Sequence, residues 1–256
     1  MNHVRMQFPV WGTIIDVDCS SQVIDSNQLN NAIQDIRDFC VTVDEDFSTY
    51  IDSSWVTRLR RRKVEIHDCP KNIQAVWNLC EQAKYLSDDA FDPWAVEGGF
   101  DPSGLVKGWA ADICADMLVS AGAQHVQVNA AGDIALRGGY FDSADGVIKP
   151  WKIGVVNPDN KQEILQTFEI TDGAIATSGT YERGAHITDP YTGMIAIGAK
   201  SATVVGPDGW LCDALATGLM VAGQDAAKWF GQEELANYKV WVIDRHENNA
   251  WSIGDE

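Results

Sequence analysis

A carboxylate and a hydroxyl lie one helical turn apart in the segment LCDALATGLMVAG. Asp213 and Thr217 are four positions apart, so both side chains would fall on one face of a helix. Small residues surround them and allow a ligand or a second backbone to approach closely. Hard oxygen donors at this spacing suit Mg²⁺, which takes one or two carboxylates and completes its shell with water and phosphate oxygens. The competing interpretation is the solvated polar face of an ordinary helix, because this spacing also arises by chance.

A second segment, FDPSGLVKGWAAD, has the features of an anion-binding helix start. Asp101 precedes a turn begun by proline, the helix is predicted to begin at Ser103 or Gly104, and Lys107 falls in its first turn. Free backbone N–H groups at a helix N-terminus bind anions, and a lysine there adds positive charge. The segment is not a P-loop, because the chain contains no G-x-x-x-x-G-K-[ST] sequence. A capped helix with one ordinary lysine explains these residues equally well, and Asp112 further along could be a surface residue.

The third segment, SGTYERGAHITDPYTG, places a histidine just before a strong turn sequence at 189–193. Ser178 and Gly179 at its start are predicted to form a turn that leaves a strand. His186 can accept a proton near neutral pH, although a lone histidine is more often structural. Asp189 is close enough in sequence to orient the histidine ring, but capping of the turn explains Asp189 equally well.

The charge of the chain excludes several classes of partner. Lys and Arg total 19 against 37 Asp and Glu, a formal net charge of −18, so non-specific binding of nucleic acid or of an anionic membrane is not expected. The N-terminus has no charged segment followed by a long apolar run, and no stretch of about 18 apolar residues occurs. Six scattered cysteines indicate reduced thiols in a core. We therefore expect a cytoplasmic chain without stable membrane insertion, although a trimmed exported form would look the same.

The predicted helices and strands come in separate runs along the chain. Helical periodicity covers residues 26–39, 71–86, 104–121 and 211–222, with Gly122 closing the third helix. Strands are predicted at GTIIDVDC, HVQVN, IALRG, WKIGVVN, ILQTFEI, KSATVVG, YKVWVI and AWSIG. This order favours an α+β fold, with largely antiparallel sheets and packed helices, over a doubly wound parallel sheet. Since no linker or repeat interrupts the chain, we expect a single domain over residues 1–256.

Taken in their order along the chain, the three segments resemble those of the ApbE family of FAD:protein FMN transferases, or flavin transferases. Further matching stretches are WGTIIDVD, STYIDSS, SDDAFDP and NAAGD, so the resemblance runs from residue 11 to about residue 223. Each motif alone is weak, but the ordered set is specific. NAAGD departs from the paired-glycine form that is usual in the family, at Ala130 and Ala131. The lipoprotein signal of many members is missing, which is consistent with the expected cytoplasmic location.

The resemblance implies an enzyme that binds FAD, uses Mg²⁺, and transfers FMN to a serine or threonine hydroxyl of a partner flavoprotein, releasing AMP. The implied acceptor carries an S/T-G-A-S/T-type motif. By similarity, Asp213, Thr217 and the main-chain carbonyl of Gly104 hold Mg²⁺, and His186 is the general base. The implied FAD contacts are Trp11, Tyr50, Ala90, Phe91, Asp92, Asp101, Lys107 and Thr188.

Two other functions use the same residues. In a Mg²⁺-dependent FAD pyrophosphatase, water would replace the acceptor hydroxyl, and free FMN and AMP would leave. The other alternative is a non-catalytic FAD-binding protein. Lys107, His186, Asp213 and Thr217 favour catalysis over simple binding, because binding alone needs no base.

Overall fold

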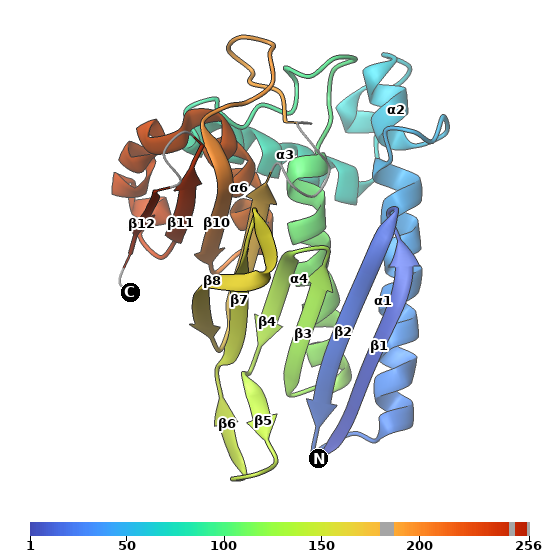
Figure 1. Cartoon of the computed structure of the whole chain (residues 1–256). Helices are drawn as coiled ribbons and strands as arrows, with labels where there is room; N and C mark the ends of the chain where they lie inside the picture. Colours follow the sequence, from blue (N-terminus) through green and yellow to red (C-terminus); the bar gives the residue numbers. More distant parts are fainter. Residues whose placement is uncertain (180–186, 246–248, 255–256) are drawn as a thin grey trace.

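The centre of the molecule is an eight-stranded sheet in which every pair of neighbouring strands is antiparallel (Figure 1). The computed structural model describes residues 1–179, 187–245 and 249–254. In spatial order the strands are β1 (Asn2–Val10), β2 (Thr13–Ser21), β3 (His125–Ala130), β4 (Asp133–Arg137), β9 (Gly173–Gly179), β10 (Ala199–Gly206), β11 (Lys239–Asp244) and β12 (Ala250–Ile253). The predicted α+β class with largely antiparallel strands is confirmed.

Three long helices pack against one face of this sheet: α1 (Ser26–Phe47), α4 (Ser103–Ala121) and α6 (Gly209–Ala222) (Figure 1). Their apolar side chains bury a row of strand residues that face the same way, including Val17, Val128 and Ala135. The remaining helices are α2 (Trp55–Arg60), α3 (Lys71–Leu86) and the 3₁₀ segments Ile66–Asp68, Gly223–Gly231 and Glu233–Leu235. Among the described residues, no helix is both long and apolar enough to cross a membrane.

The opposite face of the sheet carries a small second core under a hairpin. This hairpin is formed by β7 (Trp151–Asn157) and β8 (Asn160–Ile170), and a shorter one is formed by β5 (Tyr140–Asp142) and β6 (Val147–Lys149). The larger hairpin covers apolar side chains of the central strands, among them Ile134, Leu136 and Ile175. The helices and the site described below therefore lie on one side of the sheet, and this hairpin lies on the other.

Two tight turns place residues at the edge of the site. Trp11 and Gly12 connect β1 to β2, and Ala131 and Gly132 connect β3 to β4; all four have positive φ, between 56° and 99°. Ala131 adopts φ 57°, a left-handed conformation for which glycine is the usual choice. In NAAGD, alanine therefore occupies a turn position that glycine more often fills. Since β2 pairs with β3, both turns lie at the same end of the sheet.

The structure extends or corrects several predicted elements. α1 continues to Phe47, because Cys40 and Val43 prolong its buried stripe beyond the predicted end at residue 39. β1, α2 and the β5–β6 hairpin were not predicted, although β1 alternates inward and outward residues as a strand should. The predicted turn at Ser178 and Gly179 is wrong: both residues stay in β9 and pair with Ala202 and Ser201 of β10.

Candidate active site

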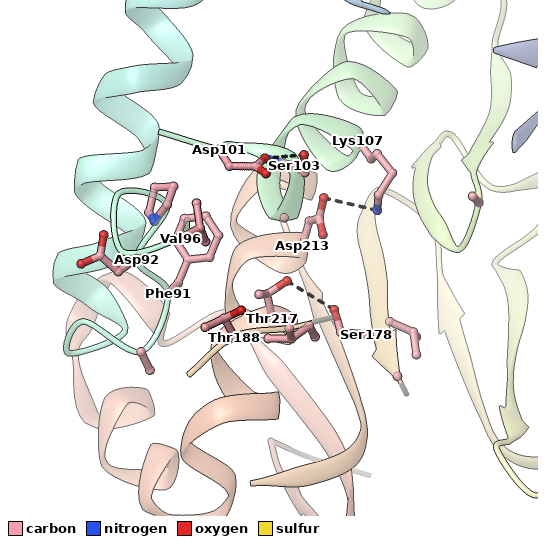
Figure 2. Close-up of a pocket in the computed structure, with 17 residues that line it drawn as sticks. Phe91, Asp92, Val96, Asp101, Ser103, Lys107, Ser178, Thr188, Asp213 and Thr217 are labelled. Atoms are coloured by element: carbon pink, nitrogen blue, oxygen red, sulfur yellow. Dashed lines mark hydrogen bonds and ion pairs between the residues drawn. The ribbon is translucent and has the colours of Figure 1, made fainter. Parts of the chain in front are cut away.

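A cavity opens where the N-terminal end of α4 meets α6 and the end of β9 (Figure 2). It gathers segments that are far apart in the chain. The predicted site residues that line it are Ala90, Phe91, Asp92, Asp101, Gly104, Lys107, Thr188, Asp213 and Thr217. Further lining residues, to which the sequence analysis gave no role in the site, include Ser103, Ala131, Thr177 and Ser178. The fold thus brings the three chemically suggestive segments into one place.

Trp11 and Tyr50, the other predicted contacts, line a second cavity beside the first. The two cavities share Ser103 and Lys107 in their walls. The indole N–H of Trp11 donates to the carbonyl of Cys40 at 2.9 Å, which fixes the ring, whereas Tyr50 is 95% exposed. An extended ligand could therefore reach from one cavity to the other past Lys107.

Asp213 and Thr217 do fall on one face of α6, as the spacing predicted. Asp213 is buried, and the hydroxyl of Thr217 lies 3.4 Å from that of Ser178 on β9 (Figure 2). Gly104 of α4 packs directly opposite: a Cβ at this position would lie 2.9 Å from Thr217 Oγ1 and 3.2 Å from Phe91 Cε2. Glycine is needed here because any side chain would fill the space beside these oxygens.

The same oxygens fit a magnesium ion by their chemistry. Asp213 supplies a carboxylate, Thr217 a hydroxyl, and Gly104 a carbonyl next to non-helical dihedral angles, φ −84° and ψ 18°. Within the described ranges there is no group of three or more His, Cys, Asp and Glu residues that could hold a metal ion. A site with few carboxylates is unlike a structural zinc site, and it suits Mg²⁺, which completes its shell with water and phosphate oxygens.

Lys107 lies between two buried carboxylates. Its Nζ pairs with Asp133. The same Nζ lies 3.6 Å from Asp213 Oδ2 (Figure 2). Asp213 Oδ2 also accepts the backbone N–H of Gly108 at 3.3 Å. Asp133 follows the turn at Ala131, and sequence analysis did not assign it a role, although it is the last residue of NAAGD. This cluster fixes the lysine ammonium at the junction of the two cavities.

Two other acidic residues of the first cavity stabilise its rim. Asp101 accepts the backbone N–H of Ser103 at 3.0 Å and pairs with Arg60 at 3.5 Å. Asp92 pairs with Lys84 of α3. Asp101 thus lies in the cavity wall and accepts an N–H of the first residue of α4, whereas the N-cap position is Pro102 and carries no side-chain cap bond.

The predicted base cannot be placed. His186 lies outside the described residues, as does Arg183. The two residues that follow the histidine, Ile187 and Thr188, both line the first cavity.

The turn at 189–193 is confirmed, and the Asp189 side chain forms hydrogen bonds within it. The N–H of Gly193 donates to the Asp189 carbonyl at 2.8 Å. The carboxylate of Asp189 accepts the N–H of Tyr191 and the hydroxyl of Thr192, each at 2.8 Å. Of the two roles that the sequence left open for Asp189, turn capping is the one observed.

Asp112 joins the two helices that build the site and is not the surface residue that the sequence allowed. It accepts the N–H of Gly209, at the start of α6, at 2.5 Å and pairs with Arg137 at 3.2 Å. Burial raises the pKa of Asp112 to about 6, although Arg137 and the Gly209 N–H partly oppose this. The backbones of α4 and α6 are in direct contact beside Asp112, since a Cβ on Gly108 would lie 2.1 Å from the Gly209 carbonyl oxygen.

Comparisons with known proteins identify the family of this chain. The model of the ApbE family matches residues 96–242. A FAD:protein FMN transferase of Vibrio cholerae is 38% identical over 135 residues, which cover 49% of this chain and 39% of the relative. One from Escherichia coli K12 is 32% identical over 168 residues, 61% of this chain and 45% of the relative. The match thus spans less than half the length of these curated relatives.

Solved structures show the same fold over almost the whole chain. The flavin transferase ApbE from Vibrio cholerae superimposes with a TM-score of 0.81 at 23% identity, covering 98% of this chain and 96% of that one. The ApbE protein from Thermotoga maritima gives a TM-score of 0.82 with the same identity and the same coverage of both chains. Because the family model covers more than half of the sequence, including both helices of the site, this chain belongs to the ApbE family.

Proposed function

We propose that this protein transfers FMN from FAD to a serine or threonine hydroxyl of a partner flavoprotein, in a Mg²⁺-dependent reaction that releases AMP. The main support is the single cavity that gathers Gly104, Lys107, Thr188, Asp213 and Thr217. These are residues that the resemblance implies for the metal and for FAD. The curated relatives described above are named for this transfer.

In this proposal, FAD spans the two adjoining cavities. Its pyrophosphate lies at their junction beside Lys107, the flavin lies toward Thr188, and the other end extends toward Trp11 and Tyr50. Asp213, Thr217 and the Gly104 carbonyl would hold Mg²⁺, which neutralises charge on pyrophosphate oxygens when bound. Lys107 would place a positive charge beside the same oxygens. Asp133 holds the lysine ammonium in position.

His186 is proposed to take the proton of the acceptor hydroxyl. The hydroxyl oxygen then forms a bond to the phosphorus of the FMN half, the bond from that phosphorus to the bridging pyrophosphate oxygen breaks, and AMP leaves. Support comes from the position of His186 in the sequence, one residue before Ile187, which lines the cavity. The cytoplasmic location stays a prediction.

The test is incubation with FAD, Mg²⁺ and a flavoprotein domain carrying the S/T-G-A-S/T-type motif. A covalent FMN adduct on the domain, detected by mass spectrometry together with an equal amount of AMP, is expected. Free FMN and AMP without an adduct would instead identify a pyrophosphatase. FAD binding with neither product would identify a non-catalytic binding protein.

A further inference from the structure

A cluster of positive charge covers the last turn of α2 and the three residues after it. Residues 58–63 read RLRRRK, in a protein whose net charge is −18. Arg61, Arg62 and Lys63, here called the basic turn, are all exposed. Backbone bonds fix the turn, since the N–H of Arg62 donates to Leu59 and that of Lys63 to Arg58, each at 2.9 Å. The three cations are therefore concentrated on one short surface turn.

The basic turn adjoins the rims of both cavities. Arg60, just before it, donates to the Glu97 carbonyl at 2.6 Å and pairs with Asp101, which lines the first cavity. Arg61 pairs with Asp52 at 2.6 Å, and the preceding residues 48–51 line the second cavity. Figure 1 shows α2 at the same end of the molecule as the start of α4. A partner held at this turn would be next to the opening of the site.

These charges are not part of the cavity walls. None of Arg61, Arg62 and Lys63 is among the described residues that line either cavity. The pyrophosphate of FAD is already provided for inside, by Lys107 and the proposed Mg²⁺. Although Arg61 pairs with the exposed Asp52, the basic turn presents its side chains at the surface, where a second, larger substrate could contact them.

Charge complementarity indicates what kind of surface this substrate has. A protein of net charge −18 repels an acidic partner over most of its surface, so a local cationic turn attracts that partner to one place and in one orientation. A basic partner would be attracted broadly and would gain no orientation from this turn. The observations thus favour an acidic protein surface.

We propose that the basic turn docks an acidic surface beside the modified serine or threonine of the acceptor protein, and so directs the hydroxyl to the cavity. This inference rests on the proposed function, because it assumes a protein acceptor. It adds the charge of that acceptor and the place where it binds.

Two fluorescent peptides with the S/T-G-A-S/T-type motif test the proposal by binding alone. One has Asp and Glu flanks, the other has Asn and Gln in their place, and both carry valine at the modified position so that no transfer occurs. With FAD and Mg²⁺ present, we expect the acidic peptide to bind about ten times more tightly at low salt, and the difference to shrink as salt screens the charges. Equal affinity for the two peptides overturns the proposal.

A neutralised variant locates the effect. Arg61→Gln, Arg62→Gln and Lys63→Gln together should abolish the preference for the acidic peptide, with FAD affinity unchanged. The matched control removes three positive charges on distant strands, through Arg5→Gln, Lys152→Gln and Lys161→Gln. This control should keep the preference. If both variants lose the preference equally, net charge and not this turn is responsible.

Further outcomes separate this proposal from its rivals. If neutralising the basic turn weakens FAD binding instead, the turn serves FAD and the proposal is wrong. If the wild type shows no peptide preference but binds phosphatidylglycerol vesicles, and the variant does not, the turn binds membranes. Transfer to threonine-containing versions of the peptides is measured separately. A retained binding preference without any FMN adduct would contradict the proposed function and leave the docking surface in place.

Discussion

Asp213 is a buried carboxylate that accepts the N–H of Gly108 and lies 3.6 Å from the ammonium of Lys107, two groups of α4. We expect Asp213→Asn to abolish Mg²⁺-dependent FMN transfer, because the amide is a much weaker ligand for a hard cation. The fold should survive, since asparagine keeps the shape and Lys107 retains Asp133. Transfer rates across a magnesium titration, together with thermal unfolding, check this. Wild-type turnover at the same magnesium concentrations would refute the metal assignment.

His186 carries the proposed proton transfer. His186→Ala should slow FMN transfer by roughly 10² to 10⁴, the usual contribution of a positioned base, while FAD affinity changes little. The wild-type rate should rise with pH through the titration of the histidine, because only the neutral ring accepts a proton. Single-turnover transfer measured across pH, beside FAD titration, tests both points. Lost FAD binding with unchanged transfer per bound FAD would make the histidine structural.

Helices α4 and α6 cross with their backbones in close contact. A Cβ on Gly108 would lie 2.1 Å from the carbonyl oxygen of Gly209, so the helices would have to separate. Gly108→Ala should therefore lower the free energy of unfolding by about 1–3 kcal/mol or more. Gly231→Ala is the matched control, because a Cβ there meets nothing within 4 Å. Urea unfolding compares the two, and equal stability would contradict the tight crossing.

The stability of the contact between α4 and α6 should depend on pH through the carboxylate of Asp112. Burial raises its pKa to about 6 from the model-peptide value of about 4, so the folded state binds the proton more tightly than the unfolded state. Its contribution to stability should therefore fall as pH rises from about 4 to about 6 and stay low above that. The melting temperature of the wild type minus that of Asp112→Asn should decrease over this range. A flat difference would show that Asp112 does not titrate there.

The features of this fold that depend on local residue pattern could be predicted from the sequence. Helices such as α3 and α6 follow from their periodicity, and the Asp213–Thr217 pair follows from the spacing on one helix face. The order of the strands could not be read, because each pairing depends on residues far away in the chain. Asp133 was missed for the same reason: its partner Lys107 lies on another element. We propose that residues 1–256 form one domain, since one sheet joins β1 to β12.

The pairing of β2 with β3 also bears on how the chain acquires its site during synthesis. Ile15 lies opposite Ala130, so more than a hundred residues must be made before the first half of the sheet can close. Closing such long loops costs entropy, and topologies dominated by distant pairings fold slowly. The cavity further requires Asp213 and Thr217 of α6, which follows the strands β1 to β10 in the chain. A nascent chain therefore emerges from the ribosome without this cavity, and binding of the proposed FAD substrate must follow folding.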